Sequence, residues 1–138
     1  MKAYANHNNL RQPNEGDAGY DIHLTRPLLL LPKQRKLIDT GVHLQLPDGV
    51  VGMIAGRSSS AKRGIAVLGG IIDPGYRGSI GVVVYNTSWR PHYFRYGERI
   101  AQILLLRNVV PGIEWVTYPA YLGETDRGEK GFGERTGR

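Results

Sequence analysis

Asp73 stands in the stretch GGIIDPGYRG, with two isoleucines before it and Pro74 and Gly75 after it. The pattern has two interpretations. Asp can accept hydrogen bonds from the backbone of a turn, Pro fixes φ at the second position and Gly accepts a positive φ at the third, so Asp73 suits a turn. The same turn can hold a carboxylate toward a water molecule, where it acts as a general base. These residues alone leave both interpretations open.

Two other clusters offer groups that suit phosphate or metal chemistry. The segment GRSSSA (56–61) presents the guanidinium of Arg57 and the hydroxyls of Ser58 and Ser59 at a predicted helix start. Arginine and the N–H groups of a helix start both favour anions, although a plain helix cap would use the same residues. The segment DAGYDI (17–22) places two acids, including Asp21, beside a turn of small residues.

A strand and the C-terminal tail supply the remaining candidates. GERIAQILL (97–105) places Gln102 in an apolar strand, where its amide needs hydrogen-bond partners; a satisfied core glutamine is the alternative. RGEKGFG (127–133) offers cations and one ring, Phe132, that could stack on a base. The tail from Gly123 onward is too polar to fold alone, so plain disorder is its alternative.

The elements that must position these groups are mostly short strands. Alternating or apolar runs broken by Gly, Pro and Asp predict an all-β sandwich or barrel. Residues 58–63 predict one helical turn with a serine as its N-cap. The predicted strands are 35–46 (interrupted at Thr40 and Gly41), 50–56, 79–86, 98–106 and 113–118.

The composition limits the class of protein. A chain of 138 residues suggests one domain, and a net charge of +6 favours anionic partners or a solvated basic surface. The absence of cysteine excludes disulfides and thiolate chemistry. The N-terminus lacks the apolar core of a signal peptide, and the runs LLLL (28–31) and ILLL (103–106) are too short to span a bilayer. We therefore expect a cytoplasmic protein (or one inside the host cell, if viral) with no membrane partner.

The five clusters in this order resemble the five motifs of the trimeric dUTPase family: DAGYDI, GRSSSA, GGIIDPGYRG, GERIAQILL and RGEKGFG. The resemblance runs from about residue 17 to the C-terminus. It implies a β jelly-roll or barrel subunit (1–122) with a flexible C-terminal arm (123–138), and a homotrimer. It also implies Mg²⁺-dependent hydrolysis of dUTP to dUMP and pyrophosphate, which limits uracil in DNA and supplies dUMP for dTTP synthesis.

The resemblance also implies roles for single residues. Asp73 matches the acid that activates the attacking water, and the turn then serves to position it. Tyr76 matches the ring packed on the deoxyribose, and Asp21 matches an acid that reaches the metal through water. The residues implied to bind substrate are the phosphate group Arg57, Ser58, Ser59 and Gln102, the uracil-reading hairpin with Val67, Gly70, Ile71 and Ile72, and the arm residues Arg127 and Phe132.

The sequence departs from the family pattern in three places. Gly75 stands where the family commonly has a second acid, and the segment between Ser58 and Lys62 looks one residue short. In the tail, Lys130 replaces a usual glycine and GFGERTG is one residue longer than usual. These departures concern the γ-phosphate contacts and the closed arm, and they leave the reaction class unchanged.

Three other functions compete with dUTP hydrolysis. A dCTP deaminase shares RSSSA and DPGYRG, but its glutamate falls at Val83 here, and residues 79–86 contain no carboxylate. A nucleic-acid-binding β-barrel would suit the basic charge, but none of the predicted strands interleaves aromatic residues with cations, so we expect no stable nucleic-acid partner. A structural or regulatory protein on the same fold would tolerate the loss of Asp73.

Overall fold

The computed structural model of the chain describes residues 1–5 and 9–125, which form a nearly all-β domain with one short α-helix. The regular elements are β1 (Lys2–Ala5), β2 (Leu10–Arg11), β3 (Tyr20–His23), β4 (Leu28–Leu30), β5 (Arg35–Asp39), β6 (Val42–Gln45), β7 (Val50–Ala55), α1 (Ser58–Lys62), β8 (Ile65–Leu68), β9 (Ile71–Ile72), β10 (Gly81–Asn86), β11 (His92–Phe94), β12 (Arg99–Arg107) and the 3₁₀ helix η2 (Pro119–Leu122).

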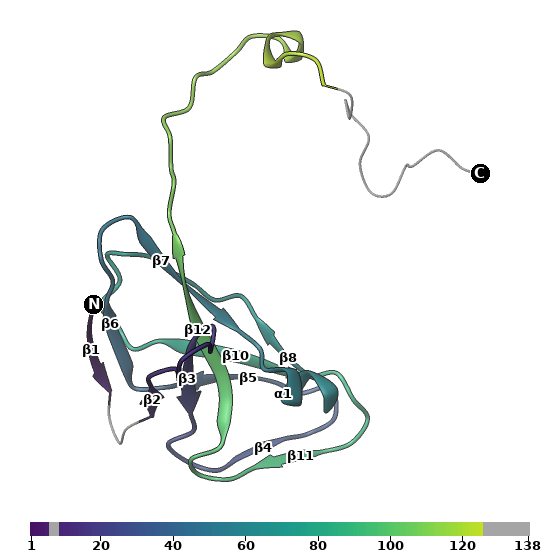
Figure 1. Ribbon diagram of the computed structural model, residues 1–138. Helices are drawn as coiled ribbons and strands as arrows, with labels where there is room; N and C mark the ends of the chain where they lie inside the picture. Colours follow the sequence, from purple (N-terminus) through teal and green to yellow (C-terminus); the bar gives the residue numbers. More distant parts are fainter. Residues whose placement is uncertain (6–8, 126–138) are drawn as a thin grey trace.

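The described strands form four sheets, and all their pairings are antiparallel (Figure 1). The largest has the order β2-β3-β12-β7-β9, and a second has the order β5-β10-β8. Strands β1 and β6 form a pair, as do β4 and β11. Neighbours in these sheets are often far apart in sequence, so distant segments are brought to common edges.

One core receives side chains from all four sheets. Alternation puts every second side chain inside, as in β10, where Val82, Val84 and Asn86 are buried. Asn86 is the polar exception, and its Nδ2 donates to the carbonyls of Leu31 and Arg90 at 3.0 and 2.8 Å. The apolar core consists of Ile22, Leu24, Leu28, Leu30, Val42, Leu44, Leu46, Ile54, Ile65, Ile72, Ile80, Val82, Val84, Phe94, Ile100, Ala101 and Ile103.

The structure confirms the all-β class and corrects several local predictions. The strands predicted over 35–46, 50–56, 79–86 and 98–106 correspond to β5 and β6, β7, β10 and β12. The helical turn corresponds to α1, but its N-cap is Arg57 without a side-chain cap bond, so the serine cap was wrong. Residues 113–118 form no strand, because an extended segment needs a pairing neighbour and the described strands offer it none.

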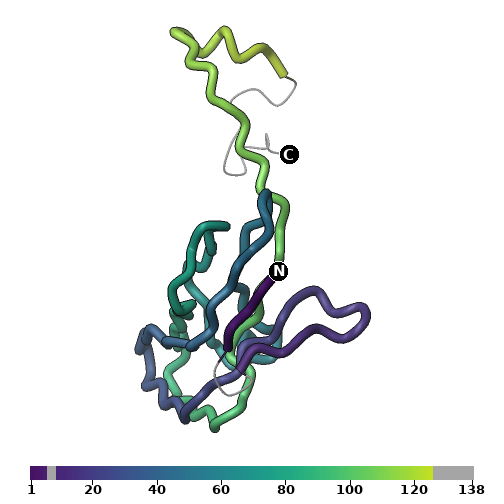
Figure 2. The backbone as a smooth tube through the Cα atoms, turned by 90° about the vertical axis from the view of Figure 1, so that its left-hand side faces the viewer, coloured from purple at the N-terminus to yellow at the C-terminus, as the bar shows by residue number. Residues whose placement is uncertain are grey.

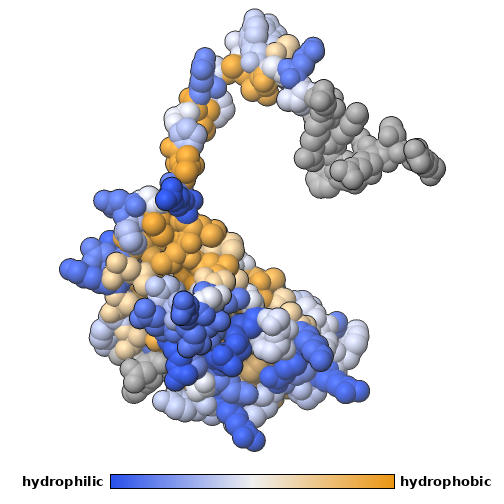
Figure 3. Space-filling view, viewed as in Figure 1, coloured by the Kyte–Doolittle hydropathy of each residue, from blue (hydrophilic) through white to orange (hydrophobic). Residues whose placement is uncertain are grey.

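The chain leaves the domain after β12. Figures 1 and 2 show residues 108–118 extending away from the strands toward η2. Most large side chains here are exposed, including Trp115 and Tyr121, and Figure 3 shows apolar colour along the segment and on the adjoining part of the domain. No helix among the described residues is long and apolar enough to cross a membrane.

Candidate active site

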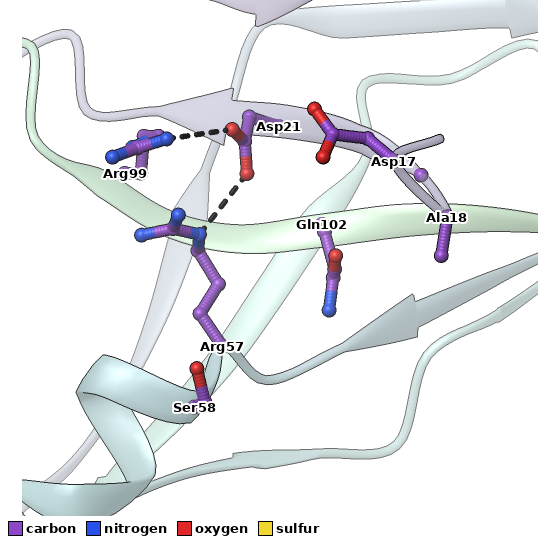
Figure 4. Close-up of a pocket in the computed structure, with 8 residues that line it drawn as sticks. Asp17, Ala18, Asp21, Arg57, Ser58, Arg99 and Gln102 are labelled. Carbon is purple, nitrogen blue, oxygen red and sulfur yellow. Dashed lines mark hydrogen bonds and ion pairs between the residues drawn. The ribbon is translucent and has the colours of Figure 1, made fainter. Parts of the chain in front are cut away.

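A polar cavity of about 160 Å³ opens beside the centre of the five-stranded sheet (Figure 4). Its lining comes from the turn before β3, from β3 itself, from the start of α1 and from β12. The lining residues are Asp17, Ala18, Gly19, Asp21, Arg57, Ser58, Arg99 and Gln102. Three of the clusters recognised in the sequence therefore meet in one place.

Asp21 is held between two arginines in this cavity. Its Oδ1 lies 3.0 Å from Arg57 Nε, and its Oδ2 lies 3.2 Å from Arg99 Nη1 (Figure 4). The Asp21 and Arg57 side chains are about one-fifth exposed, whereas Arg99 is half exposed. The two arginines and the two aspartates of the lining sum to no net charge, but each guanidinium keeps N–H donors for an anion.

A β-bulge brings Arg99 into the cavity. In the pairing of β12 with β3, Arg99 lies opposite His23 and Ala101 opposite Ile22, so the register shifts between them. Ile100 and Ala101 are therefore both buried, although they are consecutive. Without the bulge, residues 99 and 102 would point to opposite faces of the sheet. Sequence alternation missed Arg99 for this reason, because an odd spacing from Gln102 assigns the two side chains to opposite faces.

Gly19 lets the acidic turn approach β12. A Cβ atom at this position would lie 2.6 Å from the carbonyl oxygen of Ile103 and 2.7 Å from Leu104 Cδ2. Any side chain would therefore push residues 17–21 outward. The small residues of DAGYDI thus keep Asp17 and Asp21 at the cavity wall.

The other phosphate candidates lie at or near the same cavity. Gln102 Nε2 donates to the Gly56 carbonyl at 3.1 Å, so its amide is satisfied while it also lines the cavity. Ser58 lines this cavity, and exposed Ser59 lines a neighbouring one, with its Oγ 3.5 Å from Arg57 Nη1. The contacts of Gln102 are therefore compatible both with a satisfied core glutamine and with an amide that binds phosphate.

Asp73 occupies an exposed turn whose closure does not use its carboxylate. The Tyr76 N–H donates to the Asp73 carbonyl at 3.0 Å, which closes the turn through the backbone. No described side chain or backbone group is seen to bind the Asp73 carboxylate. Tyr76 Oη donates to the Ser79 carbonyl at 2.9 Å, so its ring is held over the same loop and remains 45% exposed. The turn thus presents an acid and a ring together.

Residues 65–72 connect two sheets and do not form the predicted hairpin. Strand β8 pairs with β10, whereas β9 pairs with β7. The intervening Gly70 has φ +117°, and its carbonyl accepts a hydrogen bond of 2.7 Å from the Ile54 N–H. The two residues lie so close that a Cβ added at Gly70 would be 2.6 Å from Ile54 Cβ. Val67 is half-buried, Ile71 is exposed and Ile72 is buried, so this segment presents both side chain and backbone to solvent.

Within one chain the Asp73 turn lies well away from the polar cavity. Ile72 lies opposite Gly52 on β7, and Gln102 lies opposite Ala55. Asp73 lies one residue further from Ala55 than Ile72 does. The Cα atoms of Asp73 and Gln102 are therefore separated by about 14 Å along the strands and about 10 Å across two strand spacings, or roughly 17 Å in total. A general base must lie about 3 Å from its water, so one chain does not bring all the predicted groups together.

Two predicted residues, Arg127 and Phe132, lie outside the described residues, as does the altered Lys130. The roles predicted for all the site residues remain predictions at this point. The fold and the cavity define an all-β protein with a polar site whose arginine donors suit anionic ligands.

Comparison with known proteins narrows this class to one family. A dUTPase family model matches residues 5–136. A deoxyuridine 5′-triphosphate nucleotidohydrolase of Paramecium bursaria Chlorella virus 1 is 40% identical over 121 residues, which are 87% of this chain and 84% of that protein. One from Mycobacterium sp. (strain JLS) is 42% identical over 130 residues, 90% and 84% of the two chains.

Solved structures agree with the sequence comparison. The EIAV dUTPase is 28% identical with a TM-score of 0.76, and the match covers 84% of this chain and 98% of that one. The Staphylococcus bacteriophage 80alpha dUTPase with dUpNHpp is 26% identical with a TM-score of 0.81, covering 96% and 95%. The chain therefore belongs to the dUTPase family, whose general function is the Mg²⁺-dependent hydrolysis of dUTP.

Proposed function

We propose that this chain hydrolyses dUTP to dUMP and pyrophosphate, with Asp73 as the general base for water attack on the α-phosphorus. The observation that carries the proposal is the match of the chain to the dUTPase family, together with an exposed Asp73 carboxylate in the segment that resembles its catalytic motif. Exposure alone does not single out Asp73, because Asp48 is also exposed on a turn closed through the backbone. No described group binds the Asp73 carboxylate, so it is available to accept a proton from water.

The arginine-rich cavity would bind the triphosphate. Arg57 and Arg99 retain N–H donors beyond those used by Asp21, and the Ser58 hydroxyl and Gln102 amide line the same wall. Donors fixed before substrate arrives stabilise the charge that develops on phosphate oxygens without reorganising during the reaction. The Gln102 amide is oriented by the Gly56 carbonyl, so it is one of these fixed groups.

The residues present suit a magnesium ion that is bound through water. Both oxygens of Asp21 already face arginines, so the carboxylate is poorly placed to coordinate a metal directly. No group of three or more metal-ligating side chains occurs within residues 1–5 and 9–125. Mg²⁺ usually keeps several waters and relies on substrate phosphates. Asp21 and Asp17 would hold such waters, and the ion would neutralise phosphate charge when bound.

Uracil and deoxyribose would bind at the segment around the Asp73 turn. Backbone groups at Gly70 to Ile72 can offer fixed donors and acceptors to a base edge, with Val67 and Ile71 beside them. The Tyr76 ring, held by the Ser79 carbonyl, would pack on the sugar and leave no room for a 2′-hydroxyl.

The complete site would form between subunits of a homotrimer. Roughly 17 Å separates Asp73 from Gln102 in one chain, so we infer that the Asp73 turn of one subunit faces the phosphate cavity of its neighbour. The arm, with Arg127 and Phe132, would close over the phosphates and the base. Closure would exclude water and complete the positive charge around the triphosphate.

Deamination of dCTP is disfavoured by the strand that follows the turn. Its base would come from β10, but β10 consists of Gly81, three valines, Tyr85 and Asn86, with no carboxylate. A deaminating site would therefore lack a base at the position that its chemistry requires.

The test compares Asp73→Asn with a matched control. Asp48 is also an exposed aspartate in a turn, within Pro-Asp-Gly, so Asp48→Asn makes the same chemical change outside the segment that resembles the catalytic motif. Pyrophosphate and ammonia are followed separately with Mg²⁺ and dUTP, dCTP, dTTP or UTP. We expect pyrophosphate from dUTP with little from the other nucleotides, no ammonia from dCTP, a loss of about 10²–10⁴-fold for Asp73→Asn, and no loss for Asp48→Asn. A loss below threefold at Asp73, or ammonia from dCTP, would contradict the proposal.

A further inference from the structure

The two-stranded β4–β11 sheet carries exposed rings and cations that the proposed reaction does not use. Trp89, Tyr93 and Tyr96 are 81%, 56% and 61% exposed. They occur in the stretch WRPHYFRY (89–96), which contains Arg90 and Arg95 between the rings. The sequence prediction missed β11, so this interleaving of aromatic residues and cations also went unnoticed. We call the β4–β11 sheet, its flanking turns and the first four residues of β5 (together 24–38 and 87–97) the β11 platform.

The whole net charge of the chain is located on the platform. Residues 24–38 and 87–97 contain six lysines and arginines and no acidic residue. The remaining twelve lysines and arginines equal the twelve acidic residues of the chain, so they leave no net charge. Of the two acids that border these segments, Asp39 accepts from Ser79, outside the platform, whereas Glu98 accepts from the backbone N–H of Arg95 and lies at the platform's edge. With one acid at its edge, a surface that carries six cations attracts polyanions.

A cation contacts the backbone at each edge of the two-stranded sheet. Tyr93 lies opposite Leu29, and both side chains point outward while their neighbours Leu28, Leu30 and Phe94 are buried. Lys36 Nζ donates to the Leu29 carbonyl at 2.8 Å. On the other side, Arg63 lies 4.3 Å from the Phe94 ring centroid and 3.4 Å from the Tyr93 carbonyl. Each cation keeps further donors for phosphate.

Trp89 is presented on a rigid turn. Buried Asn86 binds the turn through its side chain, accepting from Ser88 N–H at 3.0 Å and donating to the Arg90 carbonyl at 2.8 Å. Lys33 Nζ lies 4.4 Å from the centroid of the Trp89 ring, so a cation covers one face of the indole. The high exposure of Trp89 leaves the other face open to solvent. A fixed ring with one open face is suited to stacking on a base.

We propose that the β11 platform binds single-stranded DNA, with bases stacked on Trp89, Tyr93 and Tyr96 and phosphates paired with the surrounding cations. Stacking on rings beside a cationic track is how proteins bind single strands without reading sequence. The exposed aliphatic side chains of Leu29 and Leu31 favour deoxyribose, because a ribose 2′-hydroxyl against them would lose hydrogen bonds to water. The lower edge of the domain in Figure 3, where Figure 1 places β4 and β11, shows mainly hydrophilic and intermediate colours.

A lipid surface fits the same residues less well. Arg95 lies two positions after Tyr93 and Arg90 directly follows Trp89, so each ring has a guanidinium beside it. Burying the rings in hydrocarbon would carry these charges out of water, which is costly. Against a single strand, the same spacing places charges next to phosphates. The proposal departs from the sequence-based expectation of no stable nucleic-acid partner, and the experiments below decide between them.

The two tryptophans of the chain provide matched reporters. In Trp115→Phe only Trp89 fluoresces, and in Trp89→Phe only Trp115, which is 86% exposed and lies outside the platform. Each full-length protein is titrated with the oligonucleotide dT12, with U12, and with vesicles containing phosphatidylserine. We expect dT12 to quench Trp89 saturably and to leave Trp115 unchanged. Stronger binding of U12, a response to vesicles alone, equal quenching of both tryptophans, or no quenching would overturn the proposal.

Affinity measurements with labelled dT12 test the contacts. If the platform neutralises three or four phosphates, its binding of dT12 should weaken by about 20- to 50-fold between 50 and 200 mM salt. Tyr93→Ala should weaken it by about fivefold or more. Arg90→Gln and Arg95→Gln should weaken it, whereas the exposed Arg11→Gln and Arg107→Gln, which lie off the platform, should not. Hydrolysis of dUTP should be unchanged in Tyr93→Ala, which separates this surface from the proposed active site. Salt-independent binding, or equal losses in both arginine pairs, would contradict the assignment.

Discussion

The roughly 17 Å between Asp73 and Gln102 within one chain leads to a quantitative prediction about mixed assemblies. Asp73→Asn removes the proposed base and leaves the cavity intact. Arg57→Ala removes a cavity cation that lies 3.0 Å from Asp21 and leaves the Asp73 turn intact. Each variant alone should be inactive, because every site in its homotrimer lacks one of the two parts.

Mixing the two inactive variants should restore part of the activity. If each site joins the cavity of one subunit to the turn of its neighbour, a working site needs an intact cavity beside an intact turn. With equal amounts and random reassembly, the probability is one half times one half, so about a quarter of the sites should work.

The assay dissociates and reassembles the proteins together, confirms mixed assemblies by mass and follows pyrophosphate release from dUTP. Separately reassembled variants, combined only afterwards, are the control for subunit exchange. If the Asp73 turn served the cavity of its own chain, no mixed assembly would contain a working site, because neither chain carries both parts. Confirmed mixed assemblies without activity would therefore refute the reasoning.

Three further predictions concern the sugar, the arm and pH. Tyr76→Ala should lower dUTP turnover but narrow the dUTP/UTP preference in kcat/KM, since space opens beside the sugar; an unchanged ratio would remove Tyr76 from this role. Truncation after Leu122 should leave a folded assembly with severely reduced turnover, and wild-type turnover would contradict a catalytic arm. Hydrogen bonds from the Ser79 hydroxyl and the Gly41 N–H hold the pKa of Asp39 below its ordinary value of 3.8. The ionised side chain therefore stabilises the fold above that pH, and the stabilisation is lost as the pH falls through the lowered pKa. Melting temperatures of wild type and Asp39→Asn should accordingly differ near neutral pH and converge in acid.

The sequence prediction missed two short strands, each of which follows a proline. Strand β4 has three residues and follows Pro27, and β11 has three residues and follows Pro91. Neither is long enough to show convincing alternation, and each becomes a strand because the other pairs with it. The β11 platform could not be recognised before that pairing was known.

Features that depend only on neighbouring residues were predictable before the fold was known. Asp73, Pro74 and Gly75 specify a turn locally, and the structure closes that turn between Asp73 and Tyr76. The alternating pattern of β10 likewise identified a strand, because burial of one face of a sheet requires every second side chain to be apolar. The apolar run of β12 identified another strand.

Only the tertiary structure decided which of these groups share a site. The bulge at Arg99 to Ala101 reverses the side-chain parity of β12, so Arg99 and Gln102 reach the same cavity although alternation assigns them to opposite faces. The crossing of residues 65–72 from one sheet to another placed Asp73 beyond the far edge strand, away from Asp21. Both outcomes depend on register between strands distant in sequence, and a one-residue shift in register changes which face every later side chain occupies.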